Sequence, residues 1–141
     1  MNGLRILVTG GRDYTDVVAV EVALQRVVLE RLGPVADAGQ VTVVHGDAGG
    51  LDRLAGAVAH RLGFAVEAHP ADWVAPCRPT CPPHRRRRRD GVAYCPAAGV
   101  YRNALMVELG ADVALVFPGG RGTQDCVRRI RAAGIDLIEA G

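Results

Sequence analysis

The chain has 141 residues, 49% of them hydrophobic, and a formal net charge of +2, which suits a folded domain with a core and excludes an intrinsically disordered chain. No apolar run approaches the roughly 18 residues that span a bilayer, and the sequence leads from Met1 straight into a strand pattern rather than into a signal peptide, so we expect a cytoplasmic protein that does not contact membranes. All 17 basic residues are arginine and serine is absent, which excludes a P-loop lysine, a Schiff-base lysine and a serine nucleophile.

Apolar runs and segments of helical periodicity alternate along most of the chain. We expect strands at 4–9, 41–45, 65–69, 112–117 and 135–139, and helices at 16–32, 51–62, 99–109 and 122–133. Thr15 or Asp16 could cap the first helix. This alternation predicts an α/β fold of the Rossmann-like, doubly wound kind, with a mostly parallel sheet of about five strands and helices on both faces. We expect residues 1–141 to form this one domain.

Three of the expected strands end in glycine-rich turns. The turns are Thr9-Gly10-Gly11-Arg12-Asp13, His45-Gly46-Asp47-Ala48-Gly49-Gly50-Leu51-Asp52 and Phe117-Pro118-Gly119-Gly120-Arg121-Gly122-Thr123. Glycine lets the backbone approach an anion closely, and the first N–H groups of a helix point at it. Because the carboxyl ends of parallel strands share one edge, we expect the turns to converge on a nucleotide site. A plain tight turn is the alternative for each of them taken alone.

The residues in and around these turns form the predicted ligand-binding set. Its members are Gly10, Gly11, Arg12, Asp13, His45, Gly46, Asp47, Gly49, Gly50, Asp52, Arg102, Asn103, Pro118, Gly119, Gly120, Gly122 and Thr123. The glycines and Thr123 would cradle a phosphate, and the guanidinium groups of Arg12 and Arg102 can each hold two phosphate oxygens. A surface salt bridge is the alternative for Arg102.

The acidic residues and the histidine of the second turn each have more than one interpretation. Asp47 and Asp52 could accept hydrogen bonds from ribose hydroxyls or base amines, or they could cap a helix. Asp52 could also be a plain first-turn residue that the helix dipole favours. His45 stands at a strand end and is either a general base or a histidine satisfied within the core.

Residues 70–98 interrupt the alternation and hold six of the eight prolines and three of the four cysteines. Cys77, Cys81, His84 and Cys95 have the residue types and spacing of a closed tetrahedral zinc site. The segment has few large apolar groups, so a structural zinc ion, one per chain, would fold this insert at 74–98. Unrelated free cysteines are the alternative, and disulfides are disfavoured in the cytoplasm. Cys126 stands apart and is expected to be a small buried hydrophobe.

Five consecutive arginines, Arg85–Arg89, lie between the third and fourth expected zinc ligands. They could contact nucleic acid phosphates, although no aromatic residue interrupts the run. A solvated loop, or a loop that covers an anionic ligand, fits the pattern equally well.

With these residues identified, the chain resembles the YspA-type proteins of the SLOG superfamily, which also holds the DprA/Smf proteins and the LOG-type phosphoribohydrolases. The resemblance rests on the three glycine-rich turns together with Ala71-Asp72-Trp73, Ala98-Gly99-Val100-Tyr101-Arg102-Asn103-Ala104-Leu105-Met106 and Gln124-Asp125. It covers nearly the whole chain except the cysteine insert. It implies a Rossmann-like fold that binds a nucleotide or a nucleotide-derived ligand, as a sensor or sequestering module, often in conflicts between phages and bacteria. It also implies that a homodimer can form.

The same resemblance implies a second function, the hydrolysis of a nucleotide N-glycosidic bond. The LOG-type pattern pairs an arginine in R-x3-M, matched by Arg102 and Met106, with a glutamate in P-G-G-x-G-T-x2-E. Cys126 occupies the position of that glutamate, and Asp125, one residue earlier, points about 100° away on a helix. The candidate catalytic residues are therefore Arg102 with Asp47 or Asp125. A nucleotide-binding module without catalysis is the first hypothesis, and nucleic acid binding through Arg85–Arg89 is the weakest.

Overall fold

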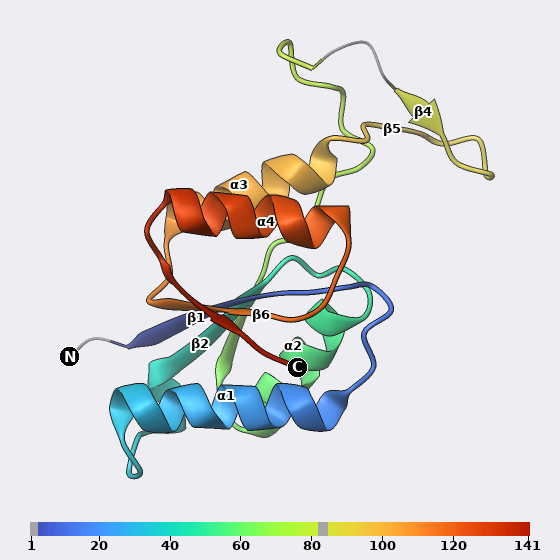
Figure 1. Ribbon diagram of the computed structural model, residues 1–141. Helices are drawn as coiled ribbons and strands as arrows, with labels where there is room; N and C mark the ends of the chain where they lie inside the picture. Colours follow the sequence, from blue (N-terminus) through green and yellow to red (C-terminus); the bar gives the residue numbers. More distant parts are fainter. Residues whose placement is uncertain (1–2, 82–84) are drawn as a thin grey trace.

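The computed structural model describes residues 3–81 and 85–141, and its central element is a parallel five-stranded sheet (Figure 1). The strands are β1 (Leu4–Thr9), β2 (Val41–His45), β3 (Ala65–Ala68), β6 (Val113–Val116) and β7 (Asp136–Glu139), in the order β3-β2-β1-β6-β7. The chain runs outward from β1 in one direction and from β6 in the other. This topology confirms the predicted doubly wound α/β fold, and it places a switch point between β1 and β6.

Two helices cover each face of the sheet (Figure 1). The helices α1 (Val17–Leu32) and α2 (Leu51–Arg61) pack on one face, and α3 (Ala98–Leu109) and α4 (Arg121–Ala132) pack on the other. A short 3-10 helix, η1 (Ala38–Gln40), leads into β2. Within the described ranges, no helix has the length and apolar character that crossing a membrane requires.

The central strands are apolar throughout because they contribute to a core on each face. Ile6 and Val8 of β1 pack with α1 and α2, whereas Leu7 between them packs with α3 and α4. All three side chains are at most 1% exposed. Such strands appear in the sequence as continuous apolar runs rather than as alternating patterns.

Local chemistry sets the first helix boundary. The Asp16 side chain accepts a hydrogen bond from the Ala19 amide at 3.1 Å, so Asp16 rather than Thr15 is the N-cap of α1. Helix α1 ends where Gly33, at φ +85°, donates its amide to the Leu29 carbonyl at 3.0 Å.

The arginine-rich segment holds a hairpin where only a loop was expected. Strand β4 (Arg86–Arg87) pairs antiparallel with β5 (Ala93–Tyr94). Gly91, at φ +84°, closes the turn, and the Arg88 amide donates to the Val92 carbonyl at 2.9 Å. The hairpin projects away from the sheet beyond the start of α3 (Figure 1).

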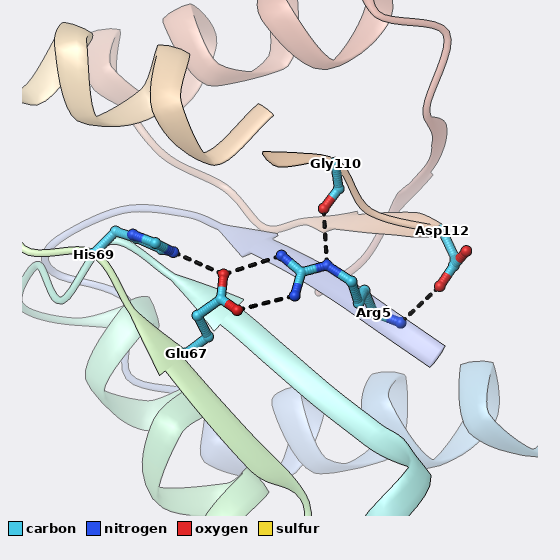
Figure 2. Close-up of polar contacts among 5 residues, drawn as sticks. All are labelled: Arg5, Glu67, His69, Gly110 and Asp112. Carbon is cyan, nitrogen blue, oxygen red and sulfur yellow. Dashed lines mark hydrogen bonds and ion pairs between the residues drawn. The ribbon is translucent and has the colours of Figure 1, made fainter. Parts of the chain in front are cut away.

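A polar network joins β1, β3 and the segment that leads into β6 (Figure 2). Both terminal nitrogens of Arg5 in β1 donate hydrogen bonds to the Glu67 carboxylate of β3, at 2.9 and 3.0 Å. The Nε atom of Arg5 donates to the Gly110 carbonyl at 3.1 Å. His69 contacts the same carboxylate at 2.8 Å, and the Arg5 amide donates to Asp112 before β6. The network lowers the pKa of Glu67 from 4.5 to about 2, chiefly through the hydrogen bonds from Arg5 and His69.

Candidate functional site

The structure brings the three glycine-rich turns together at one edge of the sheet. The Gly11 amide donates to the Pro118 carbonyl at 2.8 Å, and the Leu51 amide donates to the Gly11 carbonyl at 3.0 Å. The close approach leaves no room for side chains. A Cβ on Gly10 would lie 2.6 Å from the Leu51 side chain, and one on Gly50, which has φ +69°, would lie 2.3 Å from the Arg12 carbonyl oxygen.

A cleft of about 360 Å³ opens over the switch point between β1 and β6. Most of the predicted ligand-binding residues line it: Gly10, Gly11, Arg12, Asp13, Asp52, Arg102, Asn103, Gly120, Gly122 and Thr123. Others of that set lie in neighbouring hollows, with Gly46, Asp47 and Gly49 on one side and Pro118 and Gly119 on the other. Val8, Ala48 and Arg121 also line the cleft, and no role was predicted for them.

The helix N-termini at this edge differ in how their amide groups are used. Asp16 caps α1, and the Leu51 amide at the start of α2 is bonded to Gly11. Among the described residues no side chain caps α4, and Gly120 and Gly122 would leave open space around an added Cβ. The first amides of a helix have no partner within it. The start of α4 therefore presents N–H groups and positive dipole charge to the cleft.

Arg102 crosses from α3 to the second turn and forms one wall of the cleft. Its Nη1 donates to the Gly46 carbonyl, and its Nε donates to Asn103 Oδ1 at 2.9 Å. Asn103 in turn donates to the Gly122 carbonyl at 3.1 Å, so α3 is fixed to the start of α4. Burial lowers the pKa of Arg102, and the Asp52 carboxylate opposes that shift. The group is thus a half-buried cation with a fixed position.

Two acidic residues at or near the cleft, Asp52 and Asp125, have structural partners. Asp52 is 7% exposed and accepts the amides of Gly46 and Ala48 at 3.1 and 3.2 Å, which holds the second turn in shape. Burial raises its pKa. Asp125 accepts from Asn103 at 3.1 Å and from Arg129 at 3.0 Å, and it does not line the cleft.

His45 and Cys126 are buried beneath the site. The Nδ1 atom of His45 accepts the Asp47 amide at 2.9 Å, and burial lowers the pKa of the imidazole. His45 is therefore a buried residue whose imidazole has a main-chain hydrogen-bond partner. Burial raises the pKa of the Cys126 thiol to about 11, so this residue provides no carboxylate-like charge.

A second hollow of about 300 Å³ adjoins the cleft and shares Arg12, Ala48 and Arg102 with it. Asp47 lines this hollow and has φ +53°, the one positive value among the described non-glycine residues. Trp73 lines it as well, with the Arg12 guanidinium 5.6 Å from the centre of its ring. The sequence motif contained Trp73, but nothing in the sequence placed it beside Arg12.

Three cysteines of the insert form a cluster beside the start of α3. The sulfur atoms of Cys77, Cys81 and Cys95 all lie within 4.8 Å of one another, and those of Cys81 and Cys95 are 3.9 Å apart. Zn–S bonds of about 2.3 Å in a tetrahedron place sulfurs roughly 3.8 Å apart, so the cluster fits a metal ion. The fourth expected ligand, His84, lies outside the described residues. Tyr101, which the sequence did not single out, contacts Cys81 with its hydroxyl.

Comparisons with known proteins agree with this architecture. The model of the family described as the YspA, cpYpsA-related SLOG family matches residues 4–75. The Gene 61 protein of Mycobacterium phage D29 is 38% identical over 144 residues, which cover 97% of this chain and 96% of that protein. The X-ray structure of DNA processing protein A (DprA) from Streptococcus pneumoniae superposes with a TM-score of 0.65 at 16% identity, over 97% of this chain. That match covers 50% of the DprA chain, so this chain spans half the length of DprA and shares its fold.

Proposed function

Because the chain belongs to the YspA, cpYpsA-related SLOG family, we propose that the cleft at its switch point binds the phosphate of a nucleotide or nucleotide-derived ligand. The observation that carries the proposal is the juxtaposition of the uncapped start of α4 with Arg12 and Arg102 in one cleft. Amide donors and guanidinium groups form strong hydrogen bonds with phosphate oxygens. Gly120, directly before α4, lines this space without a side chain.

The arrangement favours binding over hydrolysis of an N-glycosidic bond. A hydrolase of this kind needs a carboxylate that stabilises oxocarbenium-like charge or positions water. Asp125 is held by Asn103 and Arg129, and Asp47 lies in the adjoining hollow rather than in the cleft. We therefore propose a sensor or sequestering module, with hydrolysis as the alternative.

The experiment is a calorimetric titration with ribose 5-phosphate and a panel of mononucleotides, cyclic dinucleotides and ADP-ribose forms. Gly122→Leu fills the cleft at a position that has open space, and we expect it to weaken binding by tenfold or more. Gly122→Ala is the matched control, because alanine improves helix propensity by about 1 kcal/mol and adds only a methyl group. Arg102→Met is expected to weaken binding too, whereas Arg26→Met on α1 is not.

Unchanged affinity in Gly122→Leu would contradict the phosphate assignment. Mass spectrometry of the same mixtures separates the two functions. Intact ligand retained after desalting, with no free base, supports a binding module, whereas free base together with a ribose phosphate would identify a hydrolase.

We further propose that Cys77, Cys81 and Cys95, with His84, hold one structural zinc ion. The sulfur separations and the shortage of apolar side chains in the insert support this site. With four protein ligands the ion would have no open position, so its contribution would be to fold the insert rather than to activate water.

Contact with nucleic acid through Arg85–Arg89 is a second candidate function. Its support is the exposure of these side chains on the projecting hairpin, together with the fold shared with a DNA processing protein. Arg85 and Arg87 also donate to the carbonyls of Ala75 and Gly91 at 2.7 and 2.8 Å, which gives them a structural role. DNA binding that falls steeply with salt and is lost when the arginines are replaced would distinguish this function.

A further inference from the structure

The hollow beside the cleft has no part in holding a single phosphate at α4. It lies between the second turn and the segment that follows β3, and its lining includes Asp47, Arg53, Ala71 and Trp73. Because Arg12 and Arg102 border both spaces, a ligand whose phosphate lies in the cleft can extend directly into the hollow.

The Trp73 side chain is fixed as a partly exposed aromatic wall. The backbone carbonyl of Trp73 accepts a hydrogen bond from the Cys95 amide at 2.8 Å. The indole packs edge-on against the Tyr94 ring, with ring centroids 6.4 Å apart. Gly99 of α3 leaves room for the indole, since a Cβ there would lie 3.1 Å from it. The insert and the start of α3 therefore hold Trp73 at the side of the hollow.

A planar cation lies over the indole in this structure. The guanidinium carbon of Arg12 is 5.6 Å from the ring centre, and a guanidinium over an aromatic ring is a flat group whose place a nucleobase can take. Arg12 also borders the cleft, so a phosphate bound there would attract the Arg12 guanidinium away from the indole.

We propose that this hollow is the base subsite of the ligand, with an aromatic nucleobase stacked on Trp73. The inference rests on the proposed phosphate site and narrows its ligand to nucleotides that keep their base. Stacking on aromatic side chains tolerates any base, because every base has a π-face. Asp47 supplies a carboxylate acceptor for an amino group at the rim, and the bond from its amide to His45 fixes the turn that carries it.

The chain provides its own probe for this test because Trp73 is its single tryptophan. Indole fluorescence, excited at the red edge of its absorption, is recorded while calorimetry measures affinity for AMP, GMP, CMP and UMP. Ribose 5-phosphate is the matched ligand without a base. We expect the nucleotide that binds to quench Trp73, and ribose 5-phosphate to bind without quenching.

The variants Trp73→Ala and Trp73→Phe complete the experiment. Removing a stacking platform costs roughly tenfold or more in affinity, so Trp73→Ala is expected to lose that much for the nucleotide and nothing for ribose 5-phosphate. Trp73→Phe keeps a ring and is expected to lose only a few-fold. If Trp73→Ala loses affinity for both ligands, the result for Trp73→Phe is used instead, because this variant keeps an aromatic ring. Loss of affinity for both ligands in Trp73→Phe as well would overturn the inference.

Nucleotide binding that neither changes the fluorescence nor weakens in Trp73→Ala would overturn the base subsite and leave the phosphate site intact. If neither the nucleotides nor ribose 5-phosphate bind, the proposed function fails and the base subsite fails with it.

Discussion

At the scale of single residues, the same side-chain types occur here in structural and in ligand-facing positions. Asp52 and Asp125 are engaged by amide groups and by neighbouring side chains, whereas Asp13 borders the cleft and is exposed. Sequence patterns identified all three as acidic residues near a site. Hydrogen-bond partners distinguish them. Asp52 accepts two amides of its own turn, whereas Asp125 accepts from Asn103 of α3 as well as from a residue of its own helix.

The Arg5–Glu67–His69 network predicts a pH dependence of stability. The pKa of Glu67 is about 2 in the folded protein against 4.5 for the free group, so its stabilising effect is fully present above about pH 4.5 and is lost as the pH falls toward 2. We expect Glu67→Gln to unfold at a lower temperature than the wild type near neutral pH. The carboxylate is 35% exposed, so the gap will be modest.

Thermal melts of both proteins across this pH range measure the effect. The gap in melting temperature should persist down to about pH 4.5 and close on further acidification. A gap of the same size at both ends of this range would show that the carboxylate charge is not what stabilises the network.

At the scale of elements, the four α-helices and the five strands of the parallel sheet begin and end within one residue of the ranges that the sequence predicted. The central strands β1, β2 and β6 are continuous apolar runs, as is typical of parallel strands covered on both faces, and the helices show their own periodicity. The β4–β5 hairpin was missed because two-residue strands, one of them made of arginine, carry no periodic signal. Trp73 was missed as a wall of the site because its contact with Arg12 joins segments far apart in the sequence.

The insert is expected to depend on metal while the sheet does not. The sulfur atoms of its three described cysteines lie within 4.8 Å of one another. The insert contributes little to the two hydrophobic cores, which are built almost entirely from the strands and the four helices. Cys95→Ala, or a chelator, should therefore release the proposed zinc ion and make residues 74–98 sensitive to proteolysis. The far-ultraviolet circular dichroism should change little.

Metal analysis, limited proteolysis and circular dichroism test this prediction, with Cys126→Ala as the matched control outside the cluster. Freshly purified protein without zinc, or a sheet that unfolds with the insert, would contradict it.

At the scale of the whole molecule, the two cores share the same strands. Leu7, Val44 and Ala114 contribute to the core under α3 and α4, while their neighbours Ile6 and Val43 contribute to the core under α1 and α2. A strand cannot leave one core without leaving the other. We therefore expect a single cooperative unfolding transition.

Conservative truncations on the two faces should then shift the same transition. Ile6→Val and Ile130→Val each remove one fully buried methylene from a different core, at a cost of about 0.5–1.5 kcal/mol. Val35→Ala, at 94% exposure, is the control and should stay within about 0.5 kcal/mol of wild type. Urea titrations followed by two optical probes check this, and separate midpoints for the two faces would contradict it.

Main-chain hydrogen bonds, from Gly11 to Pro118 and from Leu51 to Gly11, join the three turns that frame the cleft. Bonds between peptide groups do not depend on the identity of the side chains at the rim. Residues such as Asp13, Arg121 and Trp73 can thus be exchanged without altering the distance between the turns. Over evolutionary time, a scaffold of this kind can change the molecule it recognises by replacing its rim residues one by one, while the cavity keeps its shape.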